Sequence, residues 1–212
     1  MKTIKVLNLY AGIGGNRKLW ENVKVTAVEN NKEIAKIYQS FFPNDKVVVA
    51  DAHKYLLEHY KEFDFIWSSP PCPTHSRFNH LFKEQECKKP RYPDMRLYQE
   101  IIFLKYWFKG KWVVENVMSY YQPLIKPFES GNHYFWSNFI INNTSKQERG
   151  IRTQNIETQQ KTRGVSLDSF NIPKTFKKTI LNNMVFSKLG LFVFNSAFKE
   201  QQKVLNLEIE GK

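Results

Sequence analysis

The chain has 212 residues, of which 42% are hydrophobic and 25% charged, so it is long enough for one globular domain with a sizeable core. Lys and Arg number 32 against 20 Asp and Glu, which gives a formal net charge of +12. This excess favours a polyanionic partner or an acidic surface. No apolar run reaches the roughly 20 residues that span a bilayer, and the first residues lack a signal-peptide pattern, so we expect a cytoplasmic protein without membrane segments.

The two cysteines, Cys72 and Cys87, do not form a metal-ligand cluster, since neither CxxC nor HxxxH spacing occurs in the sequence. Two cysteines are also too few for a disulfide framework. We therefore expect no bound metal and a reducing compartment.

The N-terminal residues predict a strand over 4–9 that runs into a glycine turn over 10–15, followed by a helix that starts within 17–21. Further strands are predicted over 23–29, 46–51, 64–68 and 111–117, and helices over 31–42, 53–61 and 94–108. This alternation predicts an α/β, Rossmann-like fold with a mostly parallel sheet and helices on both faces. The aromatic residues expected in the core include Trp67, Trp107, Phe108 and Trp112.

Polar or reactive residues follow the predicted strands at their carboxyl ends, where open parallel sheets bind ligands. In chain order they are the glycine turn, Glu29, Asp51, the segment 68–72 and Glu115. Any one of them alone is as readily an ordinary turn residue. Five at the same edge of the sheet predict a binding site.

The first half of this edge suits a nucleoside. Glycines in the turn 10–15 allow a tight bend and a close approach of ligand to backbone. Glu29 is placed to accept hydrogen bonds from ribose hydroxyls, and Asp51 to accept one from an adenine amino group. Because no pyrophosphate fingerprint accompanies them, these residues describe S-adenosylmethionine as well as NAD.

The second half suits nucleophilic chemistry. Pro70, Pro71 and Pro73 fix the backbone around Cys72 and therefore the direction of its thiol. The alternative is a small buried hydrophobic role, which is the commoner one for a cysteine. Glu115 ends an apolar strand, where a carboxyl group must be paired, hydrogen-bonded or protonated.

These residues resemble the motifs of cytosine-5 DNA methyltransferases, in the order in which that family has them. NLYAGIGG at 8–15 is similar to the family's DLFAGIGG loop, SSPPC at 68–72 to its PPCQ loop, and ENV at 115–117 to its ENV motif. Glu29 and Asp51 fall where the family has its ribose and adenine contacts. The resemblance covers residues 4–117 and implies the Rossmann-like fold of S-adenosylmethionine-dependent methyltransferases.

The resemblance also implies a division of the chain. Residues 1–141 would form the catalytic, cofactor-binding domain, 142–180 a short basic target-recognition segment, and 181–212 a return to the catalytic domain. The return contains LNNMVFSKLGLFVF at 181–194, similar to the family's last motif, which covers the cofactor near the glycine loop. Since the recognition segment is short for the family, we expect short or relaxed target recognition and a phage or mobile-element origin.

The family's reaction assigns roles to these residues. Carbon 5 of cytosine is a poor nucleophile, so the thiolate of Cys72 would add to carbon 6 while Glu115 binds N3 and the exocyclic amine. The activated ring would take the methyl group of S-adenosyl-L-methionine, leaving S-adenosyl-L-homocysteine, with the target base flipped out of the stack. The resemblance thus implies Cys72 and Glu115 as catalytic residues. It implies as cofactor-binding residues Tyr10, Gly12, Ile13, Gly14, Gly15, Glu29, Asn30, Asp51, Ala52, Pro71, Leu97 and Asn183.

The implied partner is DNA, held through phosphate contacts that give affinity more than base readout. Basic residues after the cysteine loop and within 142–180 are the candidates for these contacts, together with two polar residues of the loop itself. The predicted nucleic-acid-binding residues are His75, Ser76, Lys88, Lys89, Arg91, Arg149, Arg152 and Arg163.

Three departures from the family pattern stand out. Asn8 replaces the acid that often precedes the glycine loop, and Pro73 replaces the glutamine of the PPCQ loop. The family's QxRxR strand, whose arginine helps the ENV glutamate to bind cytosine, has no clear counterpart. The segment 132–141 takes its place in the order, with Asn132 and His133 at the arginine position. A shifted version would use Gln147, Arg149 and Arg152.

Other functions remain open at this level. The same chemistry could act on RNA, because nothing in 142–180 distinguishes the two nucleic acids. A methyltransferase subunit that needs a recognition partner is a further alternative, whereas a binding protein without activity would have lost Cys72 or Glu115. A dehydrogenase is disfavoured, since no hydride-site residues accompany the glycine loop. We expect a monomer, and restriction-modification, phage protection and epigenetic marking would all leave the same pattern.

Overall fold

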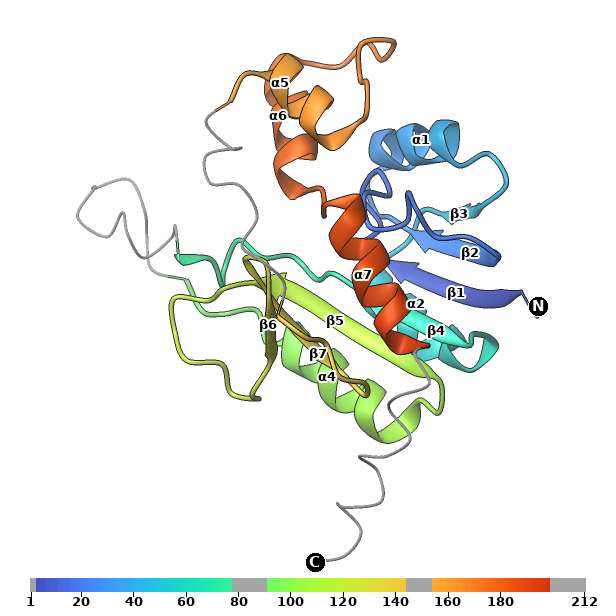
Figure 1. The fold of residues 1–212 in the computed structure, drawn as a ribbon, viewed down its shortest axis with the longest axis vertical. Coiled ribbons are helices and arrows are strands. Elements are labelled where there is room, and N and C mark those ends of the chain that lie inside the picture. Colours follow the sequence, from blue (N-terminus) through green and yellow to red (C-terminus); the bar gives the residue numbers. More distant parts are fainter. Residues whose placement is uncertain (1–2, 78–90, 144–153, 199–212) are drawn as a thin grey trace, which may run out of the picture.

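The computed structural model describes residues 3–77, 91–143 and 154–198. Within these ranges seven strands form one sheet, in the order β3-β2-β1-β4-β5-β7-β6 (Figure 1). They are β1 (Ile4–Leu9), β2 (Val23–Val28), β3 (Lys46–Val48), β4 (Phe65–Ser68), β5 (Lys111–Val117), β6 (Phe128–Ser130) and β7 (His133–Ser137). The first five pair in parallel, whereas β7 runs antiparallel to both β5 and β6. This mostly parallel sheet confirms the predicted Rossmann-like α/β class.

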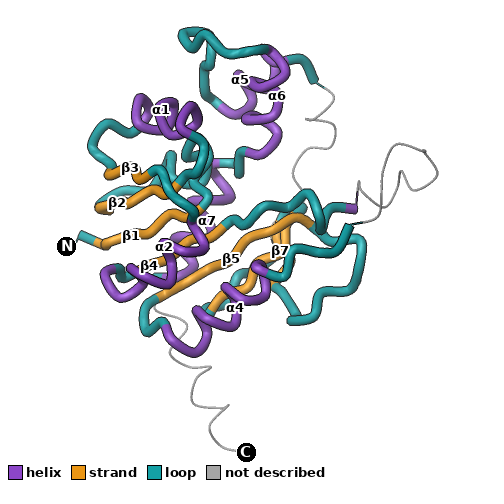
Figure 2. Tube along the Cα trace, turned by 180° about the vertical axis from the view of Figure 1, so that it is seen from behind, coloured by secondary structure: helices purple, strands orange, loops and turns teal. Residues whose placement is uncertain are grey.

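Helices cover both faces of the sheet, because alternate residues of the central strands are apolar on both sides. Leu7 and Leu9 of β1 pack with Leu56 of α2 and Leu104 of α4, whereas Val6 packs with Val193 of α7. Figures 1 and 2 show α7 on one face and α2 and α4 on the other. The helices are α1 (Lys32–Phe41), α2 (Ala52–His59), α4 (Arg96–Trp107), α5 (Ile156–Arg163), α6 (Lys174–Asn183) and α7 (Ser187–Ala197). None of the helices in the described ranges is long and apolar enough to cross a membrane.

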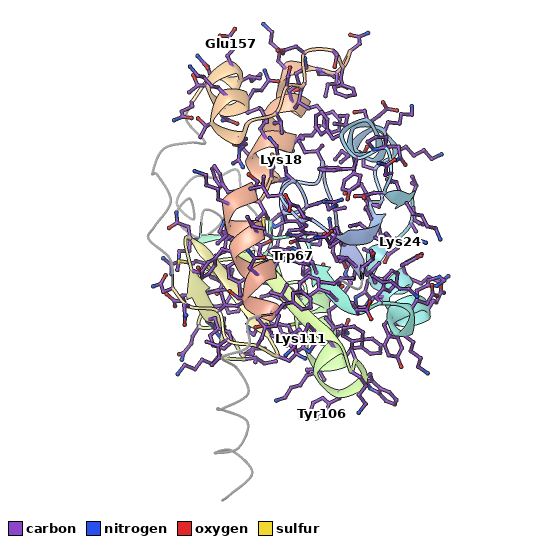
Figure 3. The ribbon with its side chains drawn as sticks, turned by 45° about the vertical axis from the view of Figure 1, so that its right-hand side comes forward. Lys18, Lys24, Trp67, Tyr106, Lys111 and Glu157 are labelled. Atoms are coloured by element: carbon purple, nitrogen blue, oxygen red, sulfur yellow. The ribbon has the colours of Figure 1, made fainter. Side chains whose placement is uncertain are left out.

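The helix predicted to start within 17–21 is not formed, and the chain there makes successive turns instead. The reason is that α7, from the C-terminal part of the chain, lies against this segment. Trp20 is buried and its Nε1 donates to the carbonyl oxygen of Gly190, 3.2 Å away. A Cβ on Gly190 would stand 2.4 Å from the backbone oxygen of Asn16, so helix and turn are in direct backbone contact. Figure 3 shows Trp67, on the same face of the sheet, beside α7.

Two further expectations need correction. The strand predicted over 46–51 ends at Val48, because Asp51 caps α2 by accepting a hydrogen bond from the backbone N–H of Lys54. Trp107, expected in the core, is 64% exposed at the end of α4. It stands beside, and not on, the buried stripe of that helix, which includes Ile101 and Leu104.

The described part of the predicted recognition segment is folded against the cofactor half of the molecule. Leu167 and Ile180 form a small core with Ile37 of α1 and Ile13 of the glycine turn. In Figure 1, α5 and α6 accordingly lie next to α1, and in Figure 2 they do so from behind. The division of the chain at residues 141 and 180 and the recognition role of 142–180 stay predictions.

Candidate functional site

A cavity of about 300 Å³ lies at the carboxyl ends of the parallel strands. It is lined from the β1 side by the glycine turn and from the β4 and β5 side by the proline loop and the ENV segment. The return after α6 closes it. The lining residues that the sequence predicted are Tyr10, Gly12, Ile13, Gly15, Glu29, Asn30, Pro71, Cys72, Glu115 and Asn183. The predicted cofactor half and the predicted chemical half therefore share one cavity.

Glu29 accepts hydrogen bonds from two backbone segments of the cofactor half. Its Oε2 accepts a hydrogen bond from the backbone N–H of Gly12 at 3.0 Å, and its Oε1 accepts one from Asn31 at 2.9 Å. Asn31 in turn caps α1. The carboxylate is buried and still lines the cavity, where its remaining lone pairs are available to hydroxyl groups of a ligand.

The glycines of the turn have different tasks. Gly12 has a φ of +54°, and a Cβ there would meet nothing within 4 Å, so the backbone is bare toward the cavity. Gly15 admits the return segment, because a Cβ there would lie 2.3 Å from the backbone oxygen of Val185. Gly14 has a φ of +81° and faces the rings of Phe42 and Tyr38 instead of the cavity. Of the predicted glycine contacts, Gly14 is thus a turn residue that does not line the site.

A buried carboxylate that the sequence did not single out supports this wall. Glu100 of α4 accepts hydrogen bonds from the hydroxyls of Tyr10 at 2.6 Å and Ser68 at 2.5 Å. Its Oε1 also lies 2.9 Å from Nδ1 of His53. Burial, and then the charge of Glu100, raise the pKa of Tyr10 far above its usual range, while the hydrogen bond to Glu100 raises the pKa of His53. The cluster ties the glycine turn to the end of β4.

Three predicted cofactor residues lie elsewhere. Asp51 caps α2, and Ala52 and Leu97 are buried in the core between the sheet and its helices. None of the three lines the cavity. Asp51 was predicted at the end of a strand over 46–51, but β3 stops at Val48. Leu97 was assigned only through the family resemblance.

Cys72 lies on a loop that the neighbouring strand holds in place. Asn116 of β5 donates from Nδ2 to the carbonyl oxygen of Pro70 at 3.0 Å, and its Oδ1 accepts from the N–H of Val117. Beyond the cysteine, the chain turns so that the carbonyl oxygen of Cys72 accepts from the N–H groups of His75 and Ser76. The half-buried cysteine therefore faces the cavity from a loop fixed at both ends.

Glu115 has a partner that the sequence left unassigned. Nδ1 of His133 lies 2.6 Å from its Oε1, and both side chains line the cavity. The pair arises because β7 runs antiparallel beside β5, with His133 opposite Val117. The alternative shifted arginines, at 149 and 152, lie outside the described residues.

Two of the predicted nucleic-acid contacts are buried. His75 is 1% exposed, its Nδ1 lies 2.6 Å from the hydroxyl of Tyr121, and burial lowers its pKa. Arg163 is 6% exposed, lies over the ring of Phe186 at 4.4 Å, and donates to the carbonyl oxygen of Met184. These two side chains support the loop and the return segment, so the structure argues against phosphate contacts by them.

The other predicted contacts are placed differently. Ser76 is half-buried in a bridge with Ser119, and Arg91 is exposed. Lys88 and Lys89, with Arg149 and Arg152, lie outside the described residues. Asn8, which replaces the acid of the family before the glycine loop, pairs through its amide with that of Asn16, and Asn16 lines the cavity.

The cavity fits S-adenosylmethionine by its donor set and its walls. Glu29 offers acceptors to ribose hydroxyls, and the apolar side chains of Ile13, Ile34 and Ile180 suit an adenine ring. The buried Oδ1 of Asn182, on the return segment, has no hydrogen-bond partner among the described residues and is an acceptor for a ligand N–H or O–H. No signal in the sequence pointed to Asn16 or Asn182, because both depend on chain segments that meet only in the fold.

Comparisons with known proteins bear on the family and the fold of this chain. The family model described as C-5 cytosine-specific DNA methylase matches residues 4–118, more than half of the chain. Among solved structures, the Entamoeba histolytica methyltransferase EhMeth aligns over 96% of this chain and 100% of its own, with 12% identity and a TM-score of 0.62. A mutant of Spodoptera frugiperda DNMT2 aligns over 92% and 100%, with the same identity and TM-score. No curated protein matches the chain. The two structures show the fold, and by the family match the chain belongs to the C-5 cytosine-specific DNA methylases, which use S-adenosylmethionine to methylate cytosine.

Proposed function

We propose that this protein methylates carbon 5 of cytosine in DNA through a covalent adduct between Cys72 and a flipped base. The observation that carries the proposal is the shared cavity, in which Cys72 and Glu115 line the same space as Gly12 and Glu29. A nucleophile and an acid are useful to methyl transfer only if the donor and the base meet. A cavity lined by both sets of residues provides that meeting.

Cys72 would act first. Its thiolate adds to carbon 6, and the electrons of the ring move toward N3, which takes a proton from the carboxyl group of Glu115. Carbon 5 becomes an enamine carbon. S-adenosylmethionine, held along Glu29, supplies an electrophilic methyl group for it.

The remaining steps restore the base and the enzyme. A solvent base removes the proton from carbon 5, the bond between carbon 6 and sulfur breaks, and the electron pair leaves with the thiolate of Cys72. The proton on N3 returns to Glu115. The loop bonds of Asn116 and His75 keep the thiol in one place throughout this cycle, which limits the entropy lost on reaching the transition state.

DNA is proposed as the substrate because the family model is one of DNA methylases and because the chain carries +12 formal charges. A paired cytosine hides both carbon 6 and N3 in the stack, so the base must be flipped out of the duplex to reach Cys72 and Glu115 in the cavity. The basic excess supplies affinity for the phosphate backbone whatever the target sequence.

The test is transfer of labelled methyl from S-adenosylmethionine to duplex DNA, single-stranded DNA and RNA, followed by analysis of the product nucleosides. We expect 5-methylcytosine in DNA, its loss in Cys72→Ser, and its retention in the matched control Cys87→Ser. Label in RNA alone would replace DNA as the substrate. No label in any nucleic acid, with the cofactor bound, would contradict a stand-alone enzyme.

A further inference from the structure

His133 touches the carboxyl group that the proposed reaction uses. Its Nδ1 lies 2.6 Å from Oε1 of Glu115, with side chains that are 20% and 8% exposed, respectively. The proposed reaction needs the proton of Glu115 on Oε2, so Oε1 is left as an acceptor and the ring nitrogen is the donor. In a sheltered place such a hydrogen bond is stronger than in water.

The sheet fixes this contact. Glu115 is paired with Phe135 across the antiparallel ladder between β5 and β7, and His133 lies two residues away on the same strand, opposite Val117. Residues two apart on a strand project to the same face, so the diagonal neighbours Glu115 and His133 can reach each other. On its other edge β7 pairs with β6, and there Ser130 lies opposite His133.

Only one oxygen of Glu115 is engaged. In the described residues no hydrogen bond to its Oε2 is found, and the side chain lines the cavity. The ionisable groups around the pair in the cavity are Cys72 on the loop after β4, with Glu29 and Tyr10 on the cofactor side. The exposed Glu129 of β6 is opposite Tyr134. Glu115 is thus held by one oxygen while the other is free to face a ligand.

We infer that His133 is the positioning residue for Glu115, fixing the carboxyl group so that its Oε2 meets N3 of the bound cytosine. This inference rests on the proposed function. In this role His133 does not contact the reacting atoms. The reaction needs the N–H donor at the Nδ1 position more than it needs the ring itself.

Two substitutions separate these features. His133→Phe keeps a ring without a donor, whereas His133→Asn puts an amide N–H near the position of Nδ1. We expect kcat to fall about 100-fold in the Phe variant, as misplaced catalytic groups commonly cause, with the KM for S-adenosylmethionine unchanged. The Asn variant should stay within about tenfold of the wild type. A matched control is His59→Phe, which removes an exposed His–Glu pair outside the cavity and should not change the rate.

A double-mutant cycle makes the dependence on Glu115 explicit. In a Glu115→Gln background, His133→Phe should cause little further loss, because the group that it positions is already gone. Equal activity of the Phe variant and the wild type, equal losses in Phe and Asn, or independent losses in the cycle would each overturn the inference.

Urea unfolding of the wild type, Glu115→Gln, His133→Phe and the double variant tests the contact without any substrate. The shifts in midpoint caused by Glu115→Gln and His133→Phe should be non-additive, since both remove one interaction. Additive shifts would overturn the inference on their own. An inactive wild type with non-additive shifts would instead count against the proposed reaction and leave the positioning contact supported.

Discussion

Asn116 donates from its side-chain amide to the carbonyl oxygen of Pro70, 3.0 Å away, so the strand that carries Glu115 also holds the loop that carries Cys72. Both sides of the proposed reaction are therefore positioned by neighbouring residues of one strand. β4 and β5 are adjacent and parallel, which brings the two segments together although 46 residues separate Asn116 from Pro70.

The first prediction concerns the hydrogen bond between Asn116 and Pro70. Asn116→Asp keeps the shape of the side chain but loses the N–H donor and sets a carboxylate against a carbonyl oxygen. We expect a loss of methyl transfer of about 100-fold, with cofactor affinity nearly unchanged, because the loop of Cys72 moves and the cofactor wall does not. Asn138→Asp is the matched control, since Asn138 makes an equivalent bond to the carbonyl oxygen of Gly110, away from the cavity. Equal losses in both variants would contradict the loop's role.

The second prediction concerns His53, whose pKa is raised from 6.5 by its hydrogen bond to Glu100. A raised pKa in the folded state means that the protonated form stabilises the protein. This stabilisation is fully present below about pH 6.5, and it is lost as the pH rises through the higher pKa of the folded state. The difference in Tm between the wild type and His53→Gln should therefore be larger near pH 6 than near pH 9. A difference that is constant with pH would contradict this pairing.

The third prediction separates two glycines of the same turn. Gly15→Ala places a Cβ against the backbone of Val185 and should lower stability by about 1–3 kcal/mol, as overpacking does, with or without cofactor. Gly12→Ala meets no atom within 4 Å but holds a φ of +54°, which costs about 1–2 kcal/mol. Its methyl group enters the cavity, so cofactor affinity should fall more than stability explains. Calorimetric titration with thermal unfolding of both variants checks this contrast.

The fourth prediction distinguishes an exposed from a buried arginine. Arg91→Ala should weaken binding to DNA of any sequence and reduce the slope of log K against log salt by about 0.9, the value for one phosphate contact. Arg163→Ala should leave this slope unchanged and lower the Tm, because Arg163 packs on Phe186 and bonds to Met184. A changed salt slope in Arg163→Ala would contradict this prediction, because it would show that Arg163 contacts a phosphate when DNA is bound.

The elements of the sheet were predictable because each strand is a short apolar run that ends in polar residues. Cys72, Glu29 and Glu115 were found by the same rule, since each lies at or shortly beyond the carboxyl end of a strand. The rule failed at Asp51, where the helix cap ends the strand early. The helix predicted to start within 17–21 was also wrong, because α7, which is distant in the sequence, packs against that segment.

The partners of the site were harder to predict than its members. Glu100 contacts Tyr10 across 90 residues, and nothing in its local sequence marks it. His133 was noted only as standing at the arginine position of the family, and its contact with Glu115 across 18 residues depends on the antiparallel pairing of β5 and β7. The packing of α5 and α6 was missed for a related reason. Their segment is polar on average, and its apolar residues, such as Leu167, are buried only through contact with α1 and the glycine turn.

The central claim is a covalent bond between Cys72 and a cytosine in DNA. The most direct measurement is trapping on a duplex in which 5-fluorocytosine replaces the target base, because fluorine on carbon 5 cannot leave as the proton does. With S-adenosylmethionine present, the account predicts a stable protein–DNA adduct whose peptide map places the base on Cys72, and no adduct in Cys72→Ser. An adduct that persists in Cys72→Ser, or methyl transfer to the natural duplex with no adduct on the fluorinated one, would contradict it.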